Sequence, residues 1–496
     1  MPRPLAIAGS AAAWIIFAAA IAWPAACLVA FLAGSPGEFL AGVVLSPRQW
    51  TLLAKSASLA VAAAIVSTIL AAAPAYAIGL AGRQSDRPLL LSALWLTLLF
   101  PPMVYAFGWE RVWASGGASY LRCMLIWSLW SWPIPAMILG GAWSRQGRAA
   151  FEAALLHTHP LSALFRVVLP AIAPHAMIAI LIVGVLCFND YAVPHACGLT
   201  LFSTELLGIA MNTTNLAEVA GPAAWPVALT LVAFFAAAKF AMPLPSIFDP
   251  STALSTTRPS PRADVATILL LVFALPVPTV GLLRELGGFE AVHRTIVIYA
   301  ADMLWSMTAA GVAGTAAVAV ALNVLCAPRA AGVLLGLTFA CGSIPGALIG
   351  TALVRAYNRD GLGWVYDDWL IVALGYVARF AWIAMLVAWL VAREHGTQII
   401  HQARLDGASK LDVAVRVLAP MRRPLFTAAT ATIAALALAE VPTTSLVRSP
   451  GFNPVAMILI DKFHRLEDDV MIALSLFLMV VAFLPAFLLR RSAKAR

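Results

Sequence analysis

Long apolar runs constrain this chain more than any other feature of its sequence. A run of about 20 predominantly apolar residues is long enough to cross a bilayer as a helix. When this length rule is applied to the hydropathy of the chain, it gives about twelve such runs. They cover residues 11–33, 52–80, 89–109, 120–142, 172–191 and 223–242, then 266–283, 308–327, 331–356, 370–392, 425–446 and 471–489.

The composition agrees with a membrane environment. Of the 496 residues, 62% are hydrophobic and only 11% are charged, and the mean hydropathy is +0.90. So few charges cannot cover the surface of a water-soluble protein of this size. We therefore predict an all-α polytopic membrane protein with about twelve spans. The first run is too long for a signal-peptide core, and we expect it to be a retained helix.

The basic residues predict an orientation. The formal charge of +9 comes from 32 Lys and Arg against 23 Asp and Glu. If the N-terminus is cytoplasmic, the inner segments hold most of the arginines, whereas the outer segments hold most of the acids, such as Asp360, Asp367 and Asp368. Because Lys and Arg favour the cytoplasmic side, we predict that both termini lie inside.

The six cysteines predict no metal site. No C-x-x-C pair occurs, and most of the cysteines lie in apolar runs. We interpret them as small core residues rather than as ligands or a disulfide frame. They are Cys27, Cys123, Cys187, Cys197, Cys326 and Cys341.

A polar loop recurs along the chain. Residues 151–170, FEAALLHTHPLSALFRVVLP, align without a gap with residues 401–420, HQARLDGASKLDVAVRVLAP. The ends of these stretches, Pro170 and Pro420, lie 250 positions apart, and the same offset places Asp190 on Glu440. Internal similarity at one fixed offset indicates a repeat. We predict two fused six-helix copies, each with its polar loop between the fourth and fifth spans.

The repeat predicts three segments. Residues 1–243 form a first transmembrane domain and residues 264–496 a second. The stretch between them, residues 244–263, is rich in Pro, Ser and Thr, a composition that suits an interdomain linker. The orientation places this linker in the cytoplasm.

The second loop, with A-R-L-D-G-A-S followed by V-L-A-P, resembles the cytoplasmic "EAA" loop of ABC-type importer permeases. Three further segments are similar to this family: GSIPGALIG at Gly342–Gly350, AEVPTT at Ala439–Thr444 and NDYAVP at Asn189–Pro194. The resemblance implies a type I ABC importer fold, with two fused binding-protein-dependent permease domains. It leans toward the iron(III) importer group and leaves polyamine, thiamine and phosphonate importers as alternatives.

The resemblance also implies a role for the two loops. In the family, a short helix, a glycine turn and a second short helix dock on a separate ATPase subunit and transmit its closure. Gly407 would supply the turn, because a residue without a Cβ can adopt a positive φ. The coupling residues implied are Glu152, Ala153, Ala154, His157, Arg166 and Pro170 in the first loop, and Ala403, Arg404, Asp406, Gly407, Arg416 and Pro420 in the second.

Both loops depart from the family pattern. His401-Gln402-Ala403 replaces E-A-A in the second loop, and His157 stands at the glycine position of the first. Each loop by itself also fits an ordinary amphipathic helix at the membrane interface.

The sequence lacks a motif for ATP binding, and this predicts a separate ATPase partner. No lysine follows a glycine, so the chain has no G-K-[ST] phosphate loop. We therefore expect no enzymatic activity and no bound cofactor or metal in this chain. ATP would be used by a partner, two copies of an ABC ATPase subunit. The resemblance adds a periplasmic or extracellular solute-binding protein and a location in the bacterial inner membrane, among lipid; no nucleic acid is expected.

Ionisable residues within spans are costly and suggest a pathway. Asp190 and Glu440 occupy one repeat position, where they could favour a cationic cargo or close a gate. Alternatively, each simply ends its helix. Arg379 is a possible partner for one of the acids, or a buried structural arginine. Pro101 and Pro345 are expected to break their helices and expose backbone carbonyls to a cavity.

Three other classes of function fit the sequence less well. A secondary transporter also uses six-span repeats, but the paired loops and the scarcity of mid-membrane charge disfavour it. A membrane enzyme lacks a nucleophile motif or metal-ligand spacing, and a scaffold would need large soluble domains. For an importer, the expected cargo is iron(III) or another small cation.

Overall fold

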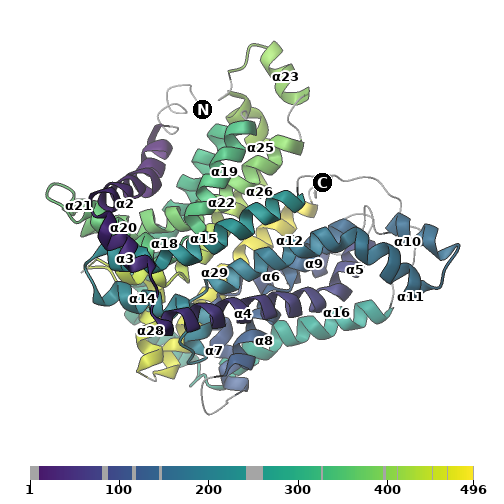
Figure 1. Ribbon diagram of the computed structural model, residues 1–496, viewed down its shortest axis with the longest axis horizontal. Helices are drawn as coiled ribbons and strands as arrows, with labels where there is room; N and C mark the ends of the chain where they lie inside the picture. The colour runs from purple at the N-terminus through teal and green to yellow at the C-terminus, as the bar shows by residue number, and fades with distance from the viewer. Residues whose placement is uncertain are drawn as a thin grey trace. The chain divides into compact units, whose positions relative to one another are not determined.

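The computed structural model describes residues 11–80, 88–113, 119–143, 148–241, 261–325, 328–394, 398–409, 412–449, 451–465 and 467–494 (Figure 1). Every regular element in these ranges is a helix. The predicted linker, residues 244–263, falls outside them except for its last three residues, where α16 begins at Pro261.

The prediction of a multi-pass helical membrane protein is confirmed by helix length and apolarity. Seven helices could cross a membrane, and two pairs of shorter helices, bent by 47° and 99°, raise the number to nine within the described ranges. Nine predicted spans therefore have a counterpart. The other three, at residues 89–109, 425–446 and 471–489, do not meet this criterion, and the total of twelve stays a prediction. The seven are Ala11–Gly34, Pro47–Leu70, Leu164–Phe188, Leu216–Ala237, Pro261–Arg284, Phe289–Val324 and Trp369–Ala392.

The chain divides into two compact units that do not coincide with its two sequence halves. Unit 1 contains Met1–Ser46, Ser203–Val227 and Glu285–Ser492. Unit 2 contains Pro47–Phe202, Ala228–Arg284 and Ala493–Arg496. Unit 2 thus combines most of the first half with the first helical segment of the second, and unit 1 combines most of the second half with the first helical segment and Ser203–Val227 of the first.

Unit 1 is built on a long helix, α18, Phe289–Val324. Its buried face consists mainly of alanine and glycine, which let neighbouring helices approach closely. A Cβ on Gly314 would meet the carbonyl oxygen of Thr430 at 2.6 Å. The neighbours of α18 are α22, Trp369–Glu394, and α26, Arg423–Leu438, and α22 also packs against α19, Pro328–Ser343.

The first half contributes α2, Trp23–Gly34, to unit 1. This helix packs against α20, Gly346–Tyr357. The Trp23 indole donates a hydrogen bond to the Ala356 carbonyl at 3.3 Å, and the Tyr357 hydroxyl donates to the Ala19 carbonyl at 2.7 Å. Such contacts fix the first helix to the second half of the chain.

Unit 2 has the reciprocal arrangement. Its helices α4, Pro47–Leu70, and α8, Tyr120–Ser131, are joined by polar contacts, including a 3.0 Å hydrogen bond from the Ser131 hydroxyl to that of Ser67. The second half contributes α16, Pro261–Ala274, and α17, Pro276–Arg284. Of these, α17 packs closely on α7, Pro102–Val112.

The predicted repeat is visible in the helix boundaries. At an offset of 250 positions, α10, Arg148–Leu155, coincides with α23, Gln398–Leu405. The helix α12, Leu169–Phe188, spans the same positions as α25, Ala419–Met421, together with α26. Likewise α13, Ala192–Ala196, begins where α27, Pro442–Val447, does. The assignment of whole domains to residues 1–243 and 264–496 stays a prediction.

Candidate functional site

The second polar loop is a helical hairpin with a glycine turn. The helix α23 ends in a Schellman motif, in which Gly407 N–H donates to the Arg404 carbonyl and Ala408 N–H to the Ala403 carbonyl, both at 3.0 Å. Gly407 has φ +81°, a conformation that costs a residue with a Cβ about 1–2 kcal/mol. The expected left-handed turn is therefore present.

A second cap starts the return arm of this loop. The Asp412 N–H donates to the Ser409 hydroxyl at 3.2 Å, and the Ser409 N–H donates to an Asp412 carboxylate oxygen at 3.3 Å. Arg416 lies one turn on, with its Nε 3.5 Å from Asp412 Oδ1. The two caps hold the hairpin in one shape.

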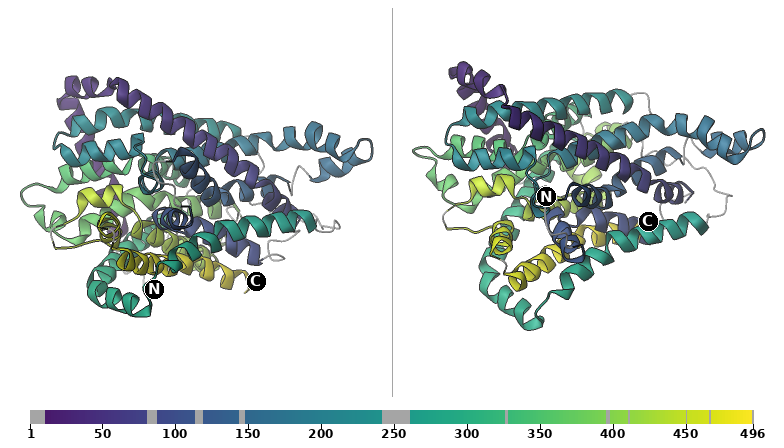
Figure 2. Two further views of the ribbon diagram at one scale, coloured as in Figure 1. Left: turned by 90° about the horizontal axis from the view of Figure 1, so that it is seen from below. Right: turned by 60° about the horizontal axis from the view of Figure 1, so that its bottom comes forward.

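The first loop makes a related turn without glycine. The His157 N–H donates to the Ala154 carbonyl at 3.0 Å, as Gly407 does to Arg404. The next amide, on Thr158, also donates to the Ala154 carbonyl, at 2.9 Å. This bond joins residues four positions apart, whereas the Ala408–Ala403 bond of the second loop joins residues five positions apart. The return arm begins with α11, Pro160–Ala163. Figure 2 shows this hairpin extending away from the rest of unit 2.

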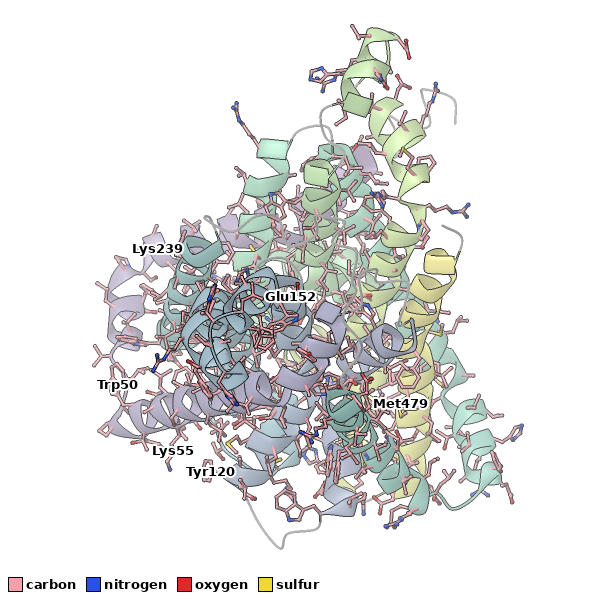
Figure 3. All side chains as sticks on the ribbon, turned by 90° about the vertical axis from the view of Figure 1, so that its right-hand side faces the viewer. Trp50, Lys55, Tyr120, Glu152, Lys239 and Met479 are labelled. Carbon is pink, nitrogen blue, oxygen red and sulfur yellow. The ribbon has the colours of Figure 1, made fainter. Side chains whose placement is uncertain are left out.

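Most of the predicted coupling residues are exposed on these hairpins. Only Ala154 and Ala403 are half-buried. Glu152 lies on α10 (Figure 3), and α23 extends beyond the other helices of unit 1 (Figure 1). The exposed ones are Glu152, Ala153, His157, Arg166, Pro170, Arg404, Asp406, Gly407, Arg416 and Pro420.

Apolar side chains are exposed beside these polar residues. Leu405 is 87% exposed at the end of α23, and its repeat equivalent Leu155 is 40% exposed. Leu156, the next residue, is 80% exposed. The sequence analysis did not identify these leucines as candidate contact residues, although a leucine at the tip of a polar hairpin suggests a contact with a partner.

Each hairpin joins its following span through a π-helix. These are η4, Leu164–Val168, and η5, Val413–Leu418, which occupy equivalent repeat positions. Such wide turns are rare and occur frequently at functional sites. Val168 and Leu418 are buried, so the junctions pack into their units while the hairpins stay exposed.

Glu440 caps a short helix inside unit 1. It is 7% exposed. Its carboxylate accepts from Thr443 N–H at 3.0 Å and from Thr444 N–H at 3.2 Å, at the start of α27. The Thr443 hydroxyl lies 3.0 Å from the carboxylate. A Cβ on Gly346 would come within 2.9 Å of Glu440 Oε1, so glycine allows α20 to pass at this point.

Arg379 links this cap to a helix break. Its Nε lies 4.0 Å from Glu440 Oε1. Its Nη1 donates to the carbonyls of Gly342 and Ile344, both at 2.6 Å. These carbonyls lose their helical partners because α19 ends at Ser343. Pro345, with φ −51° and ψ 132°, separates α19 from α20. Arg379 is therefore both a partner for the acid and a structural donor.

Asp190 has the equivalent role in unit 2. It accepts from Ala192 N–H at 3.1 Å and from Val193 N–H at 3.0 Å, at the start of α13. The third donor is the Trp127 indole, at 2.8 Å. Asp190 and Glu440 thus each accept from the amides that start the next short helix, and both their role in a pathway and the alternative that each simply ends its helix stay predictions.

The break at Pro101 is also closed by a side chain. The helix α6 ends at Leu99 and α7 begins at Pro102. The Phe100 carbonyl accepts from the Trp130 indole at 2.9 Å. Both prolines break their helices as predicted, but side chains of the following span bind carbonyls that were expected to face a cavity.

Two tryptophans and two threonines were missed by sequence inspection. Trp127 and Trp130 stand three residues apart on α8, a spacing that places both indoles on one face of a helix. That spacing could have identified them. Thr443 and Thr444 follow Glu440 at the distance typical of a capping interaction.

Among the described residues, no group of three or more His, Cys, Asp or Glu could hold a metal ion. Comparison of the chain with protein-family models, curated proteins and solved structures found no match.

Proposed function

We propose that this chain is the transmembrane permease subunit of an ATP-binding cassette importer. In this proposal it forms the translocation pathway and couples to separate ATPase subunits through the α10–α11 and α23 hairpins. The observation that carries the proposal is the pair of exposed hairpins, with helices of the same bounds 250 positions apart.

The shape of each hairpin supports docking. A short helix with an exposed leucine at its end can insert into a groove on a partner. Leu405 and Leu156 are 87% and 80% exposed, and charged residues flank them. The caps around Gly407 keep the α23 hairpin preformed, which lowers the entropic cost of binding.

The attachment of the hairpins supports transmission of force. Each leads through a π-helix into a long helical segment that ends next to an acid, the half-buried Asp190 or the buried Glu440. That acid holds the short helix beyond it. Movement of a hairpin would therefore be carried along a helical segment toward that acid, the kind of coupling that alternating access needs.

The cargo rests on the sequence resemblance. It favours iron(III) or another small cation, delivered by a solute-binding protein at the bacterial inner membrane, with both termini of the chain inside. Neither acid provides a second reason for a cation, because the contacts of both are accounted for within their own units.

The decisive experiment is a purification from native membranes in mild detergent. We expect two ATPase subunits to accompany each chain, with ATPase activity, and to be lost when both hairpins are altered. A chain that transports its cargo without any ATPase would show the function to be secondary transport.

A pair of single substitutions sharpens this experiment. Leu405→Glu places a charge at the end of one hairpin and should lower the amount of ATPase that co-purifies, because only the α10–α11 hairpin is left unaltered, while the chain still inserts. Phe289→Glu, which changes a 90% exposed residue of the same unit at the start of α18, is the matched control. Equal loss in both variants would contradict a docking role for the hairpin.

A further inference from the structure

Two cysteines far apart in the sequence meet in unit 2. Cys123 lies in the first turn of α8, and Cys197 follows the last residue of α13. They are 0% and 2% exposed. Both are thiols in the structure, and they lie close enough for each to affect the pKa of the other. Sequence inspection, which saw only their spacing, treated them as unrelated core residues.

A buried arginine brings these two helix ends together. Arg122, which is 3% exposed, donates to the Trp113 carbonyl at 3.3 Å and to the Cys197 carbonyl at 3.4 Å. The end of α7, the start of α8 and the end of α13 therefore meet at one side chain. The Arg122 side chain thus fixes the backbone of Cys197 beside the start of α8, where Cys123 lies.

The same arginine affects the reactivity of one thiol. The hydrogen bond from Cys123 and the positive charge of Arg122 lower the pKa of the Cys197 thiol, against the effect of its burial. Because the thiolate is the nucleophile in disulfide exchange, Cys197 is the better attacking group at neutral pH.

The second half of the chain does not need sulfur at these positions. The residues 250 positions on are Ala373 and Val447, which are 2% and 1% exposed. An alanine and a valine thus fill the equivalent space in unit 1. Packing alone gives no reason for a pair of cysteines in unit 2.

The predicted orientation places this pair on the outer side of the membrane. Arg111, in the last turn of α7, and Glu205, in the first turn of the helix that follows α13, both belong to stretches that the charge pattern predicts to lie outside. Disulfides form and persist in that compartment and are rare in the cytosol.

We propose that Cys123 and Cys197 form a disulfide that joins the start of α8 to the end of α13. The Cys197 thiolate attacks a sulfur of a disulfide-containing oxidant and expels one thiolate. Cys123 then loses its proton and attacks Cys197, which forms the internal S–S bond and expels the second thiolate. The two cysteines lose two electrons and two protons, and the oxidant becomes two thiols. The exchange takes place late in the folding of unit 2, when Arg122 already contacts Cys197 and the burial of the two sulfurs is not yet complete.

The test is differential thiol labelling of the full chain, isolated from membranes without reductant. Free thiols are alkylated in denaturant with N-ethylmaleimide, disulfides are reduced, and the newly released thiols take an isotope-coded reagent. We expect the second label on Cys123 and Cys197 alone. First label on both would overturn the proposal, as would linkage of either to another cysteine.

Serine variants provide the controls. In Cys123→Ser, Cys197 should take the first label. Cys187→Ser removes another buried cysteine of unit 2 and should leave the linked pair intact. Reductant should lower the unfolding midpoint of the wild type by about 5 °C or more and leave that of Cys123→Ser unchanged. Equal midpoints of the wild type with and without reductant would count against the bond. None of these measurements involves an ATPase, so their outcome is independent of the proposed function.

Discussion

The two repeats solve one structural problem with different side chains. In each, a span is broken at a proline, and a later acid caps a short helix. In unit 1, the single cation Arg379 binds both the freed carbonyls and Glu440. In unit 2, two neutral indoles share these contacts, since Trp130 binds the Phe100 carbonyl and Trp127 binds Asp190.

This difference has an energetic consequence. A buried ion pair is costly to break from one side only, because the remaining charge has no compensation. A neutral donor leaves behind a smaller penalty when it is lost. Unit 1 should therefore depend on one residue, whereas unit 2 should tolerate the loss of either indole.

The largest effect is expected for Arg379→Met. It leaves Glu440 buried without its cation and two carbonyls without a donor, and we expect a loss of about 3–5 kcal/mol in stability. Thermal unfolding in detergent measures it, with Arg355→Met, an exposed arginine of the same unit, as control. The double variant Arg379→Met/Glu440→Gln should recover part of the loss. A double variant less stable than the single one would show that the charge pair is not the cause.

A smaller effect is expected for Asp190→Ala. The substitution removes the acceptor of two backbone amides and one indole, and we expect a loss of roughly 2 kcal/mol from the missing cap and the unpaired donor. The measurement is the same unfolding experiment. Glu205→Ala, a change in the first turn of α14, Phe202–Asn212, is the control. A loss as large as that of Arg379→Met would contradict the contrast between the units.

Trp130→Phe should cost less again. It removes one neutral hydrogen bond, to the Phe100 carbonyl, and keeps most of the aromatic volume, so we expect about 1 kcal/mol. Tyr120→Phe at the first residue of α8 is a suitable control. Its ring lies 5.8 Å from the Lys55 ammonium (Figure 3), a contact that phenylalanine retains. An effect above that of Asp190→Ala would show that Trp130 does more than close the break.

The smallest effect concerns the hairpins. Gly407→Ala should cost about 1 kcal/mol at its left-handed turn. The loss should be local, seen as faster hydrogen exchange of the Gly407 and Ala408 amides with no change in the global unfolding midpoint. His157→Ala, at the equivalent position of the first hairpin, should leave exchange of the His157 and Thr158 amides unchanged. Equal acceleration in both hairpins would remove the distinction drawn between their turns.

Local features of this fold could be predicted from the sequence. Two kinds of feature were predicted and are found. The breaks at Pro101 and Pro345 and the turn at Gly407 depend on neighbouring residues. The recurrence of the polar loop can be seen by comparing the two halves of the sequence. The number of spans was less predictable, because the runs at 89–109 and 425–446 are interrupted by breaks that shorten their helices.

Contacts between distant residues could not be predicted in the same way. Periodicity shows which face of a helix is apolar, but not which other helix covers it. The pairing of Trp127 with Asp190, the contact of Cys123 with Cys197 and the exchange of first helices between halves all depend on tertiary packing. Arg379 was identified as a possible partner because an arginine within a span is expected to have one.

The exchange of first helices sets an order for synthesis of the chain. When the ribosome has added Arg284, all of unit 2 except its last four residues has been made. By contrast α2, among the first helices to enter the membrane, has no α20 to pack against until more than 300 further residues have followed. During that interval, lipid or the insertion machinery must cover the surface of α2. The hydrogen bond from Trp23 to the Ala356 carbonyl can form only after Ala356 has been made. The earliest part of the chain is thus among the last to reach its final neighbours.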